Sequence, residues 1–216
     1  KKIIETKILS VGSPRHDVFF NNKQYVKTKN KKQVLIIPSP IVNYSGLTDT
    51  GTFLNYEKLI KKIMLILNQL DVEIIVKLHP TQDDSVKFIK DIFKQIDKNI
   101  QIFHTTPILG HLKTADAVIH IEPHGVGLST AILESLILEI PTLNVVIKNE
   151  IFEFDCIKEK AILSLSDSDN LEKPISDLLN DTNVRNELIK NSKKHISKYM
   201  INPGVASESF ARKLSS

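Results

Sequence analysis

The sequence predicts an α/β fold in which a doubly wound parallel sheet carries helices on both faces. Short apolar, β-branched runs alternate with amphipathic helical patterns from residue 7 to about residue 170, which is the pattern of a parallel sheet with crossover helices. The runs are apolar throughout instead of alternating with polar residues. Strands with that composition are expected to be covered on both faces.

The clearest unit is ADAVIHIEPHGVGLSTAILESLILEIPTLNVV, residues 115–146. It predicts a strand at 117–121, a turn with one Pro and two Gly at 122–128, a helix, and a second strand at 142–147. Ser129 and Thr130 are residue types that begin helices, and Pro141 is expected to end this one. Its inner face would carry apolar residues at helical spacing, namely Leu133, Leu136, Ile137 and Ile140.

This unit is suited to binding a phosphorylated ligand. A helix N-terminus favours anions, and Gly125 and Gly127 let the backbone approach a ligand closely. The hydroxyls of Ser129 and Thr130 can donate to phosphate oxygens, and Glu134 can accept from a ribose diol. An ordinary β-turn-α unit with a capped helix remains the alternative, because GVGLS is not a full G-x-G-x-x-G motif and no G-x-x-x-x-G-K-[ST] occurs.

The other elements follow from the same periodicities. Strands are expected at 7–12, 33–38, 72–78, 100–104 and 161–165. Helices are expected at 52–70, 83–97, 108–114, 170–179, 184–199 and 205–214. Asp17 is expected to cap the segment 18–26.

Polar candidates recur just after strand ends, where ligands bind in open parallel sheets. His79 follows a strand and precedes Pro80, and a His there can contact phosphate or transfer a proton. Arg15 could reach an anion, although a surface role is the alternative. Ser39 opens a loop, 39–51, that is long enough to be functional. The remaining candidates of this kind are Thr105 and Thr106, expected at a base edge, and His124.

No metal site is expected. His104 and His111 lack a carboxylate partner at ligand spacing. Asp167-Ser168-Asp169 matches the D-x-D pattern that some sugar transferases use for a metal. Capping of the helix at 170–179 is the favoured interpretation of these acids.

Composition excludes several classes. The 216 residues are 41% hydrophobic and 25% charged, with a net charge of +4, which is ordinary for a globular domain. The scattered lysines suit a phosphorylated ligand, peripheral contact with an anionic membrane, or plain solvated surface. The sequence has no dense basic run with interleaved aromatic residues, so nucleic-acid binding is not expected. The chain has one cysteine, Cys156, which excludes an intrachain disulfide.

The chain is expected to be one nucleotide-sugar-binding domain, residues 1–216, ending in a helical segment at 183–216. It begins Lys1-Lys2 without Met, which favours a fragment of a two-domain protein. No apolar run is long enough to span a bilayer and no signal peptide is found. A cytoplasmic location is expected, and peripheral contact with the inner membrane surface is the alternative.

Several segments resemble a known family. GSPRHDVFF (12–20), KKQVLIIPSP (31–40), KLHP (77–80) and the stretch 115–143 are similar to the C-terminal, donor-binding half of GT-B glycosyltransferases, a Rossmann-like fold. The nearest group contains CDP-glycerol glycerophosphotransferases, bacterial polysialyltransferases and UDP-N-acetylglucosamine 2-epimerase-like proteins. YMINPGVASESFARKL (199–214) is similar to the terminal helical segment of such halves. The resemblance covers most of the chain through short motifs.

The resemblance implies a role for each matching residue. His79 would contact the donor phosphate or leaving nucleotide, Ser129 and Thr130 the phosphates, Glu134 the ribose, and Ile108 with its neighbours the base. It also implies a metal-independent transferase of cell-surface polysaccharide synthesis that uses a CDP-, CMP- or UDP-linked donor and no cofactor. The glycan or polyol acceptor and the catalytic base would come from an N-terminal half that this chain lacks. The chain alone is then expected to bind nucleotide with little transfer activity.

Two alternatives remain open. A UDP-sugar 2-epimerase-like isomerase would need a pair of acid/base carboxylates, and the chain lacks the S-G-G signature of those enzymes near this helix. A non-catalytic nucleotide-binding or scaffold domain is the other. EPHG resembles the E-P-x-G of retaining GT-B enzymes, but Glu122 and Glu134 are further apart than in that motif. The stereochemical outcome therefore stays undecided.

Overall fold

A single parallel sheet forms the centre of the molecule. The computed structural model of the chain describes residues 10–24, 26, 30–41, 50–80, 84–123, 128–147 and 153–215. Within these residues six strands pair in the order β3-β2-β1-β4-β5-β6, and every pairing is parallel. The strands are β1 (Lys32–Pro38), β2 (Val72–Lys77), β3 (Gln101–Phe103), β4 (Ala117–Glu122), β5 (Thr142–Val146) and β6 (Leu163–Ser166).

This order confirms the predicted doubly wound sheet. The chain winds outward from β1 to β3 and then returns to place β4 on the other side of β1. Strands β1 and β4 pair from Val34 with Ala117 to Pro38 with Ile121, so their carboxyl ends are adjacent. In a sheet of this kind, the strand order reverses at that point and opens a crevice for a ligand.

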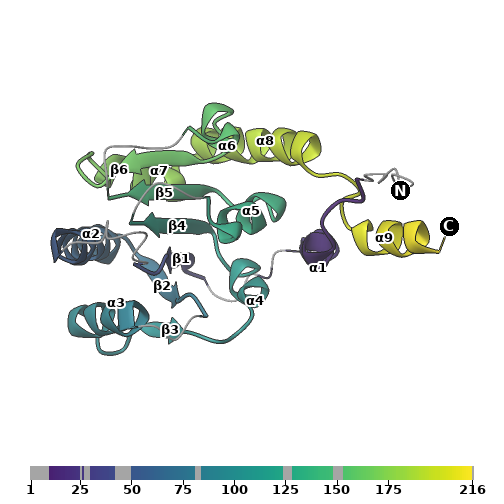
Figure 1. The fold of residues 1–216 in the computed structure, drawn as a ribbon. Coiled ribbons are helices and arrows are strands. Elements are labelled where there is room, and N and C mark those ends of the chain that lie inside the picture. Colours follow the sequence, from purple (N-terminus) through teal and green to yellow (C-terminus); the bar gives the residue numbers. More distant parts are fainter. Residues whose placement is uncertain are drawn as a thin grey trace.

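Helices cover both faces of the sheet (Figure 1). On one face lie α2 (Thr50–Asn68), α3 (Asp84–Ile96) and α7 (Glu172–Asn180); on the other lie α4 (Ile108–Leu112), α5 (Thr130–Ile137) and α6 (Asp155–Lys158). Val34 and Ile36 of β1 pack into the first layer, and Leu35 and Ile37 pack into the second. Because both faces are buried, apolar residues at successive positions all enter a core.

Three expectations about element boundaries are wrong. Helix α5 ends at Ile137 instead of continuing to Ile140, because Glu139 has a φ of 62° that breaks the helical path. Residues 10–12 form no strand, while 7–9 lie outside the described residues. The acids at 167–169 cap no helix: Asp169 accepts the Ser166 N–H at 2.7 Å, and α7 begins later, at Glu172.

Asp17 also acts differently from the expectation. The chain forms a short 3₁₀ turn, η1 (Pro14–His16), and helix α1 (Asp17–Phe20) instead of a capped segment over 18–26. The Asp17 carboxylate accepts the backbone N–H groups of Ala206 at 3.0 Å and Ser207 at 2.7 Å, so it caps α9 (Ala206–Leu214). The hydrogen bonds from Ser207 lower the pKa of Asp17. Helices α1 and α9 therefore lie together at one end of the molecule (Figure 1).

Gly12 allows the N-terminal segment to pass close to the C-terminal turn. It has a φ of 91°, and a Cβ there would lie 2.1 Å from the Ile201 carbonyl oxygen. The Asn202 side-chain amide donates to the Val11 carbonyl at 3.3 Å. These contacts fix the segment that carries Arg15.

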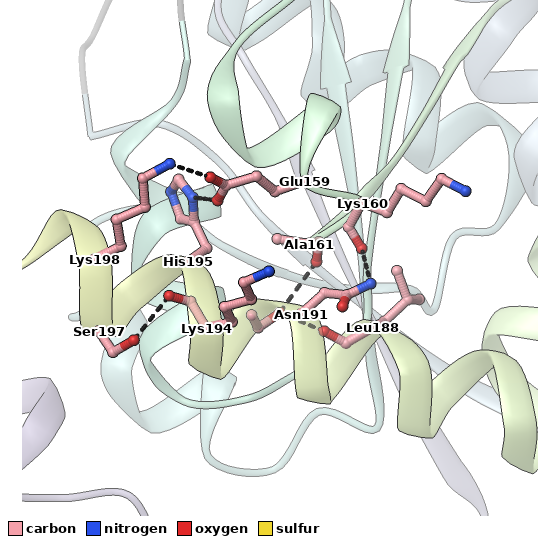
Figure 2. A network of polar contacts seen from close by, with 10 residues as sticks. Glu159, Lys160, Ala161, Leu188, Asn191, Lys194, His195, Ser197 and Lys198 are labelled. Carbon is pink, nitrogen blue, oxygen red and sulfur yellow. Dashed lines mark hydrogen bonds and ion pairs between the residues drawn. The ribbon is translucent and has the colours of Figure 1, made fainter.

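A charged cluster attaches α8 (Thr182–Tyr199) to the turn after α6 (Figure 2). Glu159 pairs with His195 Nδ1 at 2.7 Å and with Lys198 Nζ at 2.5 Å. His195 is 4% exposed, and its ring stacks on Tyr199 with 5.4 Å between ring centroids. Ser192 adds a hydrogen bond to the Ala161 carbonyl at 3.1 Å, just before β6.

We expect the Glu159 pair to make stability depend on acid pH. Hydrogen bonds from Lys198 and His195 lower the pKa of Glu159 from 4.5 to about 2. The stabilisation is therefore complete above pH 4.5 and is lost as the pH falls through about 2. Glu159→Gln should lower the midpoint of urea unfolding at neutral pH. In this variant the midpoint should also fall less steeply between pH 4.5 and about 2 than it does in the wild type.

The matched control is Glu153→Gln, whose carboxylate is 77% exposed and lies 3.9 Å from Lys158. Exposed pairs of this kind contribute little, so this variant should follow the wild-type pH curve. An unchanged acid decline in Glu159→Gln would contradict the assignment.

Candidate functional site

A cleft of about 700 Å³ opens at the carboxyl edge of the sheet, where β1 and β4 end side by side. Every predicted site residue that the structure describes lines it: Arg15, Ser39, His79, Thr105, Thr106, Ile108, Ser129, Thr130 and Glu134. His124, Gly125 and Gly127 lie outside the described residues. The structure thus brings together candidates from five separate segments, while their individual roles stay predictions.

The start of α5 supplies hydroxyl donors to the cleft. Ser129 is the N-cap residue, and its Oγ accepts the Ala131 N–H at 3.3 Å. Thr130 Oγ1 accepts from Arg15 Nη2, also at 3.3 Å. In both residues the oxygen atom is used as an acceptor, so the O–H can donate to a ligand. With the positive end of the helix beside them, these groups suit phosphate oxygens.

Glu134 lies one turn further along α5 and is ion-paired with Arg15. Its side chain is 4% exposed, and Oε1 lies 3.3 Å from Arg15 Nη2. Burial raises the pKa of Glu134, and the charge and hydrogen bond of Arg15 oppose that shift. The Arg15 side chain is 64% exposed, so it can turn towards an incoming anion. The carboxyl oxygens of Glu134 would then be open to accept hydrogen bonds from a diol.

Lys77 is a cleft residue that the sequence reasoning missed. It is 5% exposed at the end of β2, and its ammonium donates to the Leu78 and His104 carbonyls, each at 2.7 Å. Burial lowers the pKa of Lys77. Two of the three ammonium hydrogens are thus donated to the segments that follow β2 and β3, and the third can be donated to a ligand. The available signal was a lysine inside the apolar run VEIIVKL, because lysine is almost never buried without partners.

Lys77→Met is expected to weaken binding of a nucleoside diphosphate at least about tenfold, since one hydrogen bond to a charged group contributes about 1.5–3 kcal/mol. Calorimetric titration measures the loss. Lys62→Met is the matched control, because Lys62 also donates to two carbonyls, those of Asp167 at 2.9 Å and Asp169 at 2.7 Å, away from the cleft. Equal affinities in the Lys77 variant and the wild type would contradict the role.

One side of the cleft is formed by the loop after β3. Thr106 Oγ1 lies 2.8 Å from His111 Nε2, which connects this loop to α4. The His111 ring lies against Phe103, with 4.4 Å between ring centroids. Burial, and then the charge of Lys77, lower the pKa of His111. The loop that carries Thr105 to Ile108 is therefore held at both ends.

Two carboxylates line the cleft, Glu122 at the end of β4 and Glu134. Sequence reasoning placed no such pair. Among the described residues, no group of three His, Cys, Asp or Glu side chains could hold a metal ion. Asp167 and Asp169 bond instead to the hydroxyl and the N–H of Ser166.

Comparison with known proteins identifies the fold. No protein-family model matches the chain, and no curated protein matches it. Among solved structures, the glycosyltransferase SnogD from Streptomyces nogalater aligns with a TM-score of 0.56 at 15% identity, over 87% of this chain and 44% of its own. A putative UDP-N-acetylglucosamine 2-epimerase from Listeria monocytogenes gives 0.56 at 12% identity, over 92% and 50%. The S. aureus MnaA-UDP co-structure gives 0.50 at 12% identity, over 91% and 49%.

The chain therefore has the Rossmann-like fold found in GT-B glycosyltransferases and UDP-N-acetylglucosamine 2-epimerases. It spans about half the length of the structures it matches, which is consistent with the resemblance to a C-terminal half. Among the described residues, no helix is both long and apolar enough to cross a membrane.

Proposed function

We propose that this chain is the donor-binding domain of a glycosyltransferase or glycerophosphotransferase that builds a cell-surface polysaccharide. It would bind a CDP-, CMP- or UDP-linked sugar or polyol phosphate, and a second domain would supply the glycan or polyol acceptor. The observation that carries the proposal is the single cleft where predicted phosphate, ribose, base and leaving-group residues meet at the point of strand-order reversal. The UDP in the MnaA co-structure makes uridine nucleotides a first choice to test.

The proposed donor would be bound without a metal or a cofactor, by cationic and hydroxyl groups that share the cleft with the carboxylates of Glu122 and Glu134. Arg15, Lys77 and His79 line the cleft together with the hydroxyls of Ser129 and Thr130. In the transfer, an acceptor oxygen bonds to the activated carbon or phosphorus, the bond to the nucleotide phosphate breaks, and the acceptor proton passes to a base on the other domain. The groups around the departing phosphate stabilise its growing negative charge.

The proposal extends to location and partners. A transferase of this kind would act in the cytoplasm, and the net charge of +4 suits peripheral contact with an anionic inner membrane surface. Nucleic acid is not among the proposed partners.

Calorimetric titration with CMP, CDP, UMP, UDP and GDP tests the proposal, first with a chelator and then with Mg²⁺. We expect selective binding of one nucleotide with the chelator present, and weaker binding by Thr130→Ala. Thr130 is the first residue of α5 and not its cap, so helix formation should persist in that variant. Failure of all five nucleotides to bind under either condition would contradict the proposal.

The epimerase alternative gains one observation, since Glu122 and Glu134 line the same cleft. An epimerase incubated with UDP-N-acetylglucosamine in D₂O would form the second epimer and incorporate deuterium at the inverted carbon. The donor-domain proposal predicts neither. Nucleotide binding without any turnover in the full-length protein would instead favour a scaffold.

A further inference from the structure

A buried histidine lies directly behind the cleft and is hydrogen-bonded on both ring nitrogens. His120 of β4 is 1% exposed. Its Nε2 lies 3.0 Å from Ser39 Oγ, and its Nδ1 lies 2.7 Å from Asn144 Oδ1 of β5. Ser39 lines the cleft, whereas His120 and Asn144 do not. The three residues therefore form a short relay from the ligand space into the sheet.

The direction of each hydrogen bond in the relay can be deduced. Burial lowers the pKa of His120 to about 4, so the ring is neutral and carries one N–H at neutral pH. The 2.7 Å contact joins Nδ1 to an amide oxygen, which only accepts, so Nδ1 carries the hydrogen. Nε2 is then an acceptor, and the Ser39 hydroxyl donates to it.

The backbone of Ser39 is occupied as well. Its N–H donates to the Ile121 carbonyl at 2.9 Å, and its carbonyl accepts from Tyr56 Oη at 2.7 Å. Tyr56 is fully buried, and burial followed by the charge of Glu122 raises its pKa far above the ordinary value, so it remains a donor. With these contacts among the described residues, the side-chain group that Ser39 can offer a ligand is the acceptor oxygen Oγ.

The relay has the connectivity of a nucleophilic triad but lacks its driving force. A nucleophilic serine must pass its proton to the histidine, and the resulting imidazolium must be stabilised. His120 resists protonation because it is buried, and its partner is a neutral amide instead of a carboxylate. The relay therefore fixes the orientation of the Ser39 hydroxyl and does not activate it.

We propose that Ser39, positioned by His120 and Asn144, accepts a hydrogen bond from a hydroxyl or amide N–H on the transferred sugar or polyol, and does not bind phosphate. Phosphate oxygens of a nucleoside diphosphate have no hydrogen to give to Ser39. Strand β1 adjoins β2, whose end carries His79, the residue assigned to the leaving phosphate. The neutral group bonded to that phosphate is thus the part of the donor nearest Ser39. This inference rests on the proposed function and names the part of the donor that this site recognises.

A first experiment tests the hydrogen-bond direction without any ligand. Long-range ¹H–¹⁵N correlation spectra of the chain distinguish the two neutral histidine tautomers. We expect His120 to carry its proton on Nδ1, with the signal assigned by its loss in His120→Phe. A proton on Nε2 would overturn the proposal, because Ser39 would then be a hydrogen-bond donor to the ligand.

A second experiment compares each nucleotide with its conjugate, UDP with UDP-N-acetylglucosamine and CDP with CDP-glycerol. Ser39→Ala should weaken binding of a conjugate about fivefold, the effect of one neutral hydrogen bond, and leave the free nucleotide unchanged. Thr130→Ala should weaken binding of the free nucleotide and of the conjugate equally. Ser39→Thr keeps the hydroxyl and should bind the conjugate as tightly as the wild type does. Equal effects of Ser39→Ala on nucleotide and conjugate would overturn this inference while the proposed function stands. Binding of no nucleotide by the wild type would overturn both.

Discussion

His79→Ala is expected to lower the release of nucleotide from the activated donor at least about 100-fold in the full-length protein, while nucleotide affinity changes little. Histidine catalysis of this kind contributes about 10²–10⁴-fold. His79 lies two residues after the end of β2, is exposed, and lines the cleft. An imidazole there can donate to the departing phosphate, whose charge grows mainly in the transition state, so the loss should appear in turnover more than in binding.

The matched control is His104→Ala. His104 follows the neighbouring strand β3, and its backbone carbonyl, which the variant keeps, is the acceptor for Lys77. Its side chain does not line the cleft. His104→Ala should therefore turn over at nearly the wild-type rate. Similar losses in both variants would assign the effect to packing, and full activity in His79→Ala would remove His79 from the mechanism.

Glu134→Gln is expected to reduce the discrimination between ribose and dideoxyribose, because glutamine keeps one acceptor oxygen but loses the charge. The wild type should bind the ribonucleotide at least about tenfold more tightly than its 2′,3′-dideoxy analogue, because a hydrogen bond to a charged group contributes about 1.5–3 kcal/mol. Glutamine keeps the volume of the buried side chain but removes its charge and its ion pair with Arg15. Titration of the wild type and of Glu134→Gln with the ribonucleotide and its dideoxy analogue gives four affinities. The ratio of the two ribose preferences isolates the contact between Glu134 and the ribose diol.

Glu139→Gln provides the control for this cycle. Glu139 follows the same helix and pairs with Lys23 at 3.3 Å and Lys193 at 3.0 Å, away from the cleft. The Glu139→Gln variant also loses a paired carboxylate, but its preference for ribose over dideoxyribose should match that of the wild type. The ribose assignment fails if Glu134→Gln keeps the full preference.

The architecture was predictable because local composition reports strand burial directly. Apolar runs such as QVLIIP and AVIHI match β1 and β4, and the rule that ligands bind past strand ends points to His79, Thr105 and Ser129. Those side chains need no long-range information, since each follows a strand in the sequence. Parallel pairing then brings the strand ends to one edge.

The wrong expectation for Asp17 and the missed residues Lys77 and His120 arise where distant segments decide the outcome. Asp17 bonds to Ala206 and Ser207, 189 and 190 positions away, and no local pattern indicates that partner. Lys77 and His120 lie inside apolar runs, and their partners come from other strands and loops. A polar residue within an apolar strand was the unused signal, because burial without partners would be costly.

The most direct test of the donor-site assignment is a crystal structure of the chain with the nucleotide that titration selects. We expect the phosphates at the start of α5 against Ser129 and Thr130, the ribose diol on Glu134, and the base beside Ile108. Arg15 should have left Glu134 for the phosphates. A nucleotide bound outside the cleft, or one whose phosphates lie away from α5, would contradict the donor-site assignment.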